Sequence, residues 1–129
     1  MRALVLLAHG SADPDWRVPI DNILARVREA LPGESVELAF LEHLEPSLRD
    51  TVHALHARSC RSIAIVPLLL SGGGNHLKRQ IPALLADIHA ELDDVDLVLH
   101  QRALADHPVV VNAIAKVCVH AFLDGTTTS

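Results

Sequence analysis

Two apolar runs constrain the fold of this chain more than any other feature of its sequence. The first covers residues 3–8 and the second covers residues 63–70, and each has the length of a buried strand. Strands with apolar residues at successive positions, rather than at alternate ones, are typical of parallel sheets covered by helices on both faces. The two runs therefore predict the central strands of such a sheet.

The rest of the chain alternates between helical and strand-like patterns. Apolar residues recur at helical spacing in four segments, at about residues 20–31, 46–55, 81–92 and 108–121. Two further segments predict shorter strands, at residues 35–41 and 96–99. Strict alternation of strands and helices favours right-handed crossovers between parallel strands. We therefore expect an α/β fold with one doubly wound, four-stranded parallel sheet, in the order 2-1-3-4, and helices on both faces.

The composition indicates one globular domain and argues against nucleic acid as a partner. Half of the 129 residues are apolar and 21% are charged, so the chain can bury a core without disulfides. A net charge of -5 and three aromatic residues provide neither a basic face nor a stacking surface. We expect a domain over residues 1–124, a disordered tail over residues 125–129, and a cytoplasmic protein without a membrane span. Cys60 and Cys118 are expected to be buried thiols in a reducing compartment.

Three polar residues follow predicted strands at one edge of this sheet. His9 closes the first apolar run, Glu42 closes the second strand, and His76 lies in the loop after the third. Ligands of doubly wound sheets bind beyond the carboxyl ends of the strands, at the switch point between strands 1 and 3. Two imidazoles and a carboxylate suit Fe²⁺, Co²⁺, Ni²⁺ or Zn²⁺ and leave coordination positions open. Either histidine could equally accept a proton from a bound substrate.

Other residues near this edge allow more than one interpretation. Glu42 could be an ordinary solvated residue, and His43 should point away from it if the strand pleat continues. Lys78 and Arg79, beside the glycine loop, either attract an anionic substrate or are surface charges. His100 ends the fourth strand and could flank the same crevice. Four histidines fall in helical patterns and are expected to be solvated or to cap helices: His53, His56, His89 and His120.

Three familiar chemistries fit the sequence poorly. An α/β-hydrolase needs a G-x-S-x-G nucleophile elbow, which the chain lacks. A histidine phosphatase would have an arginine just before the strand-end histidine, where this chain has Ala8. The glycines at 72–74 allow close approach of a flat ligand, but they lack the G-x-x-x-x-G-K-[ST] spacing of a phosphate loop.

Three separated motifs make the chain resemble the small class II chelatases, the sirohydrochlorin cobaltochelatase and ferrochelatase family, across residues 2 to about 122. These motifs are LLAHGS at 6–11, FLE at 40–42, and VPLLL at 66–70 followed by GNHLKRQIP at 74–82. The resemblance implies a lyase that inserts a divalent metal into a tetrapyrrole without ATP, in cobalamin or sirohaem biosynthesis. It also implies that short members pair as homodimers around the cleft.

The resemblance assigns roles to residues of this chain. His9 and His76 match the catalytic histidines of the family, and Glu42 completes the metal-binding set with them. The expected substrate, sirohydrochlorin, carries eight carboxylates and requires local positive charge. The expected substrate-binding residues are therefore Arg17, Lys78, Arg79 and Arg102, together with Ser11, Gly73 and Gly74.

The resemblance leaves the metal and one rival function open. No cofactor is expected beyond the divalent metal substrate, Co²⁺, Fe²⁺ or Ni²⁺, and the ligand set suits cobalt and iron alike. Two features depart from the family pattern: Gln80 replaces an aspartate, and the glycine loop has one additional residue. The rival is a protein that binds or delivers Ni²⁺ or Co²⁺ without catalysis.

Overall fold

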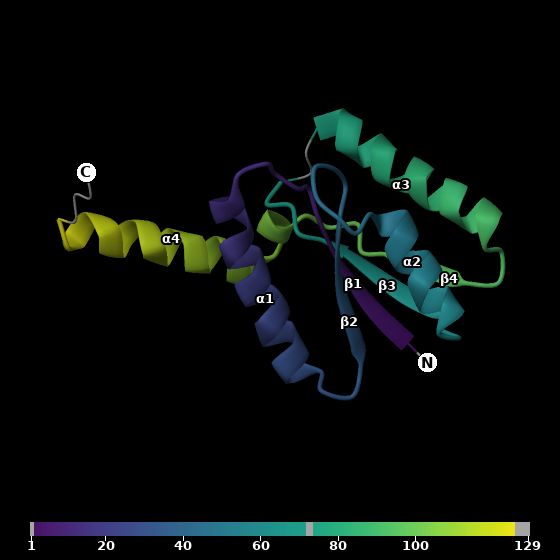
Figure 1. Cartoon of the computed structure of the whole chain (residues 1–129). Coiled ribbons are helices and arrows are strands. Elements are labelled where there is room, and N and C mark those ends of the chain that lie inside the picture. The colour runs from purple at the N-terminus through teal and green to yellow at the C-terminus, as the bar shows by residue number, and fades with distance from the viewer. Residues whose placement is uncertain (1, 72–73, 126–129) are drawn as a thin grey trace.

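Four parallel strands form one sheet with the order β2-β1-β3-β4, as predicted (Figure 1). The structure, a computed structural model, describes residues 2–71 and 74–125, and for residues 74–77 it describes the backbone alone. The strands are β1 (Arg2–Ala8), β2 (Ser35–Phe40), β3 (Ser62–Pro67) and β4 (Asp96–Leu99). The helices are α1 (Arg17–Ala30), α2 (Leu48–Ala57), α3 (Gly74–Glu91) and α4 (Pro108–Leu123), with short 3-10 helices η1 (Pro14–Trp16) and η2 (Leu104–Asp106).

The second apolar run leaves the sheet earlier than its sequence suggests. β3 ends at Pro67, which pairs with Leu7, although the apolar residues continue to Leu70. The carbonyl oxygens of Leu69 and Leu70 instead accept hydrogen bonds from the backbone of η2, at 3.0 and 2.8 Å. The end of the run therefore holds the segment that follows β4.

Asp106 belongs to the short helix that precedes α4 and does not cap α4 itself. Asp106 accepts a hydrogen bond from the backbone nitrogen of Ala103 at 3.0 Å and so closes η2. α4 begins only after His107, at Pro108, a residue that suits the first position of a helix because its missing N–H would have no partner there.

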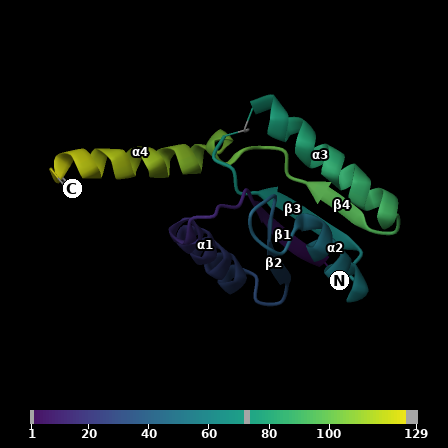
Figure 2. The ribbon, with the colours of Figure 1, turned by 45° about the horizontal axis from the view of Figure 1, so that its top comes forward.

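One face of the sheet is covered by α2 and α3. A cluster of buried aliphatic residues joins them: Ala3, Val5, Leu7, Ile63 and Ile65 from the strands, with Leu48, Val52, Leu55, Ile81 and Ile88 from the helices. Period-two alternation places these strand residues on one side of the sheet. Figure 2 shows α2 and α3 together on this side.

The opposite face is covered by α1, over β2 and β1. Buried residues of the strands, such as Leu38 and Phe40, pack against Ile20, Leu24 and Val27 of α1. Arg28 attaches the helix to the sheet, because its Nε and Nη2 donate to the carbonyl oxygen of Val36 at 3.0 and 2.7 Å. Helices therefore lie on both faces, as predicted, with α1 opposite α2 and α3.

Three other expectations concern the two cysteines, a membrane span, and the bounds of the domain and its tail. Cys60 is buried and donates to the carbonyl oxygen of Ser62, whereas Cys118 is exposed on α4, so the prediction of two buried thiols is wrong for Cys118. Within residues 2–71 and 74–125, no helix has the length and hydropathy needed to span a bilayer. The bounds of the domain and of the tail stay predictions, since residues 126–129 lie outside the described part.

Candidate metal and substrate site

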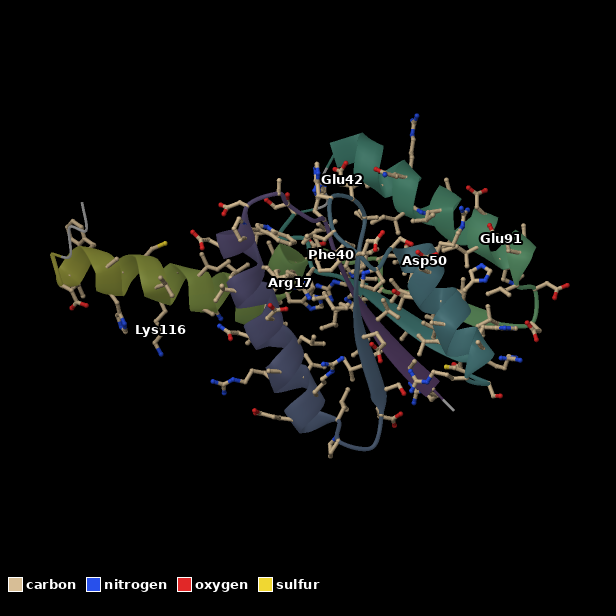
Figure 3. All side chains as sticks on the ribbon, in the orientation of Figure 1. Arg17, Phe40, Glu42, Asp50, Glu91 and Lys116 are labelled. Atoms are coloured by element: carbon tan, nitrogen blue, oxygen red, sulfur yellow. The ribbon has the colours of Figure 1, made fainter. Side chains whose placement is uncertain are left out.

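His9 and Glu42 meet at the carboxyl ends of the two neighbouring strands β1 and β2. The Nε2 atom of His9 lies 2.9 Å from Oε1 of Glu42, and both side chains are about half exposed. Hydrogen bonds continue past the strand ends: the backbone nitrogens of Leu41 and Glu42 donate to the carbonyl oxygens of Ala8 and His9, both at 2.9 Å. The sheet itself therefore aligns an imidazole with a carboxylate, and Figure 3 shows Glu42 at this end of the sheet.

Gly10 allows the two chain segments to approach this closely. Its φ is +102°, and a Cβ at this position would lie 1.7 Å from the carbonyl oxygen of Glu42. Only glycine adopts such a backbone angle readily, and no side chain can occupy that space. The glycine of the first motif is thus a packing requirement of the His9–Glu42 pair.

His43 lies on the same side as Glu42, contrary to the prediction from the pleat. β2 ends at Phe40, and His43 has a φ of +69°, so the alternation of a strand does not continue to it. Its Nε2 atom lies 3.9 Å from Oε2 of Glu42. The carboxylate of Glu42 therefore has an imidazole near each of its oxygens.

His76 belongs to the first turn of α3, which begins at Gly74. Its side chain, expected to be the third metal ligand, lies outside the described atoms, and so does all of Gly73. Among the described residues, no group of three histidine, cysteine or carboxylate side chains converges as a metal site. The structure thus pairs His9 with Glu42, and the role of His76 stays a prediction.

Two of the four cationic residues expected to bind substrate line one cavity. Lys78 and Arg102 border a cavity of about 520 Å³, between the ends of β3 and β4, the first half of α3, and η2. His100 and Gln101 line it as well, but His9 and Glu42 do not, so the expectation that His100 flanks the crevice of the metal site stays a prediction. Arg102 is held in place because its Nη2 donates to the carbonyl oxygen of Asp106 at 2.6 Å.

Ser11 and Arg17 line a second hollow, of about 390 Å³, which His43 also borders. Arg17 is engaged in local contacts: its Nε lies 3.1 Å from Oδ1 of Asp21, and its guanidinium carbon lies 5.1 Å from the ring centre of Phe40 (Figure 3). Arg79 is exposed and lines neither cavity.

Two of the four histidines that sequence patterns placed in helices, His53 and His56, pair with carboxylates. His53 Nε2 lies 2.8 Å from Oε1 of Glu91, and His56 Nε2 lies 2.7 Å from Oδ1 of Asp94, so both connect α2 to the end of α3 or the turn after it. The hydrogen bond with His56, supported by the charges of His56 and Arg61, lowers the pKa of Asp94 below its ordinary value.

The sequence profile of the CbiX family matches residues 3–121. Sirohydrochlorin cobaltochelatases of Methanococcus aeolicus and Methanopyrus kandleri are each 36% identical to this chain, over 91 and 94 residues. These matches cover 70% and 73% of this chain but 63% and 64% of the relatives, so the chain spans less than two thirds of their length.

Two solved structures resemble this fold. A CbiX protein from Marinobacter aquaeolei superposes with a TM-score of 0.84 at 28% identity, covering 98% of this chain and 100% of that one. The sirohydrochlorin chelatase SirB of Bacillus subtilis subspecies spizizenii, in complex with cobalt, superposes with a TM-score of 0.65 at 25% identity, covering 76% of this chain and 42% of SirB.

Proposed function

This chain belongs to the CbiX family, and from that premise we propose that it inserts Co²⁺ or Fe²⁺ into sirohydrochlorin without ATP. The observation that carries the proposal is the pair of His9 Nε2 and Glu42 Oε1, 2.9 Å apart at the carboxyl ends of adjacent strands. An imidazole and a carboxylate suit both metals, and their partial exposure leaves room for a second reactant. Relatives of similar sequence are sirohydrochlorin cobaltochelatases.

In the mechanism we propose, His9 and Glu42, with His76 as the third ligand, hold the metal ion against one side of the macrocycle. Two pyrrole N–H bonds break, their protons pass to the histidines or to water, and the four ring nitrogens take up the metal. Holding ion and ring together replaces a difficult encounter with an oriented one. His43, 3.9 Å from the second oxygen of Glu42, is suitably placed to orient that carboxylate or to accept a proton.

The carboxylates of the substrate would be bound beside the metal site. Lys78 and Arg102 line the larger cavity, and Ser11 and Arg17 line the smaller one. An acidic protein that binds a polyanion needs such local positive charge, because its overall field repels the ligand. We further propose that the chain acts as a homodimer, as the family resemblance implies.

The decisive experiment is an anaerobic absorption assay of sirohydrochlorin with Co²⁺, Fe²⁺ and Ni²⁺ in turn. We expect the wild-type protein to convert the spectrum of the free ring to that of the metal complex. His9→Ala and Glu42→Gln should each lower the rate at least about 100-fold, because removing a ligand costs more than removing the group that orients it. His89→Ala, which changes an exposed histidine of α3, is the matched control and should keep full activity.

Two results would contradict the proposal. Metal binding by the wild-type protein without any spectral change of sirohydrochlorin would indicate a protein that binds or delivers the metal. Full activity in both His9→Ala and Glu42→Gln would show that the reaction takes place elsewhere.

A further inference from the structure

Two histidines face each other at the two ends of the segment that joins β4 to α4. His100 directly follows β4, and His107 directly precedes α4. Their Nε2 atoms lie 3.1 Å apart, whereas the centres of the two nearly parallel rings lie 5.3 Å apart. The rings therefore point these two nitrogens at each other, and the mechanism proposed above uses neither histidine.

Two imidazole nitrogens at this distance share a proton, because two unprotonated nitrogens would repel each other. One ring donates an N–H···N hydrogen bond to the other while both rings are neutral. If that proton moves to Nδ1 of its own ring, both Nε2 atoms become free to bind a metal ion, and both rings stay neutral. The same pair can therefore supply two neutral imidazole ligands to one ion.

The distance between the two nitrogens suits one shared ion. Metal–nitrogen bonds of about 2.0–2.1 Å place two ligand nitrogens about 2.9 Å apart at a right angle and about 3.3 Å apart at the tetrahedral angle. The 3.1 Å between His100 and His107 lies between these values. With the same bond lengths, each ring must turn by about 40° to direct its lone pair at the ion. His100 is exposed and His107 is only partly buried, so neither ring is held by close packing on all sides.

The backbone on both sides of the pair is held in place. The backbone nitrogen of His100 donates to the carbonyl oxygen of Ile65 at 2.9 Å, and that of His107 donates to the carbonyl oxygen of Leu104 at 3.1 Å. The backbone nitrogen of Leu104 in turn donates to the carbonyl oxygen of Leu69 at 3.0 Å, so the segment is attached to the residues that follow β3. A site built on a fixed backbone loses little conformational entropy when it binds a ligand.

The donor atoms determine which ions such a site would take. Neutral imidazole suits Co²⁺, Ni²⁺, Cu²⁺ and Zn²⁺, whereas Mg²⁺ and Ca²⁺ prefer oxygen ligands. Asp106 offsets the positive charge of Arg102 in the same segment, where Nη2 of Arg102 donates to the carbonyl oxygen of Asp106. Among the described residues, no third histidine, cysteine or carboxylate side chain converges with the pair, so water would fill the remaining positions. The site should therefore bind its ion more weakly than a site with three protein ligands.

We propose that His100 and His107 form a second site for a divalent transition metal, separate from the one at His9 and Glu42. The two sites share no ligand, and the cavity that His100 lines is bordered by neither His9 nor Glu42. A second ion goes beyond the proposed function, which uses a single ion as substrate. Bound to this pair, the ion joins the end of β4 to the start of α4 and stiffens the segment between them.

Calorimetric titration of the untagged full chain with Ni²⁺ tests the second site. The variant His9→Ala/Glu42→Gln removes two ligands of the first site and should still bind one Ni²⁺ per chain. Adding either His100→Gln or His107→Gln to this variant should weaken the binding at least about 10-fold, because each removes one of the two ligands. Adding His89→Gln instead, at an exposed histidine of α3, should leave the affinity unchanged. Thermal melting without metal confirms that every variant is folded.

Three results would overturn the second site. The first is a His9→Ala/Glu42→Gln variant that binds no Ni²⁺. The second is an affinity that His100→Gln and His107→Gln leave unchanged, or that only one of them lowers, because the site requires both nitrogens. The third is an equal loss with His89→Gln, which would indicate binding spread over surface histidines. None of these measurements uses sirohydrochlorin, so their outcome is independent of the proposed function.

Discussion

Replacing Gly10 by alanine should damage the fold and the site together. The new Cβ would lie 1.7 Å from the carbonyl oxygen of Glu42, at a backbone φ of +102°. The obstacle is backbone, not the flexible end of a side chain, so it cannot move aside alone. Residues 9–10 and 41–42 must separate instead, and with them the Nε2 and Oε1 atoms of the His9–Glu42 pair.

The loss in free energy of unfolding follows from the interactions that break when residues 9–10 and 41–42 separate. A positive φ costs a non-glycine residue about 1–2 kcal/mol. The two backbone hydrogen bonds from Leu41 and Glu42 to Ala8 and His9 contribute about 0.5–1.5 kcal/mol each. Gly10→Ala should therefore lower the free energy of unfolding by about 2–5 kcal/mol. For a domain of this size, that corresponds to a melting temperature lower by about 7–18 °C.

Two other glycines separate the causes of this effect. A Cβ added at Gly33 would have no atom within 4 Å, and the φ of this residue is not positive, so Gly33→Ala should change stability by less than about 1 kcal/mol. Gly125 has a φ of +58° but also an open surrounding, so Gly125→Ala should show the backbone strain alone, about 1–2 kcal/mol. Urea titrations would rank the three variants, and Co²⁺ binding would report on the site. A Gly10→Ala variant as stable as Gly33→Ala, with wild-type Co²⁺ affinity, would refute the reasoning.

Two further predictions concern charge. Lys78→Ala and Arg102→Ala should each raise the KM for sirohydrochlorin several-fold, because both residues line the larger cavity. Arg79→Ala, outside that cavity, should leave the KM unchanged. Steady-state chelation kinetics measure the three KM values, and equal increases at all three positions would contradict the prediction. Asp94→Asn should lower stability at pH 7, because His56 and Arg61 favour the carboxylate and lower its pKa. The stabilisation from a lowered folded pKa is complete above the unfolded value of about 3.9 and is lost as the pH falls through the folded pKa, so the deficit of the variant should shrink over that range. Urea unfolding at pH 7 and pH 3 measures the difference, and an equal deficit at both would count against this account.

The sheet was predictable because its central strands have an unambiguous pattern. The two apolar runs predict β1 and β3 as the inner strands, and right-handed crossovers then leave few possible orders. The ends of the elements were less predictable. Pro67 ends β3 because the following carbonyls bind η2 instead of a strand, and hydrogen bonds between distant segments leave no local pattern.

The part of the site that lies at the ends of strands was predictable, because a strand end fixes where the next residues lie. His9 directly follows β1, and Glu42 comes two residues after the end of β2. Neighbouring parallel strands bring such residues together. His43 could not be placed, because the alternation of side chains ends with the strand and a positive φ turns the backbone. Arg17 was predicted from charge alone, and its contacts with Asp21 and Phe40 depend on how α1 packs.

One disagreement between sequence and structure is itself informative. The run at 63–70 predicts a strand buried on both faces, yet Val66 is only partly buried and Val98, on the neighbouring strand β4, is exposed. α4 shows the same disagreement, since its apolar circumference predicts burial and none of its residues is buried. An apolar residue in water contributes nothing to folding, so two such surfaces on one chain indicate that a larger assembly buries them. The side of the sheet around Val66 and Val98, and helix α4, are therefore the places where burial within one chain does not account for the apolar pattern of the sequence.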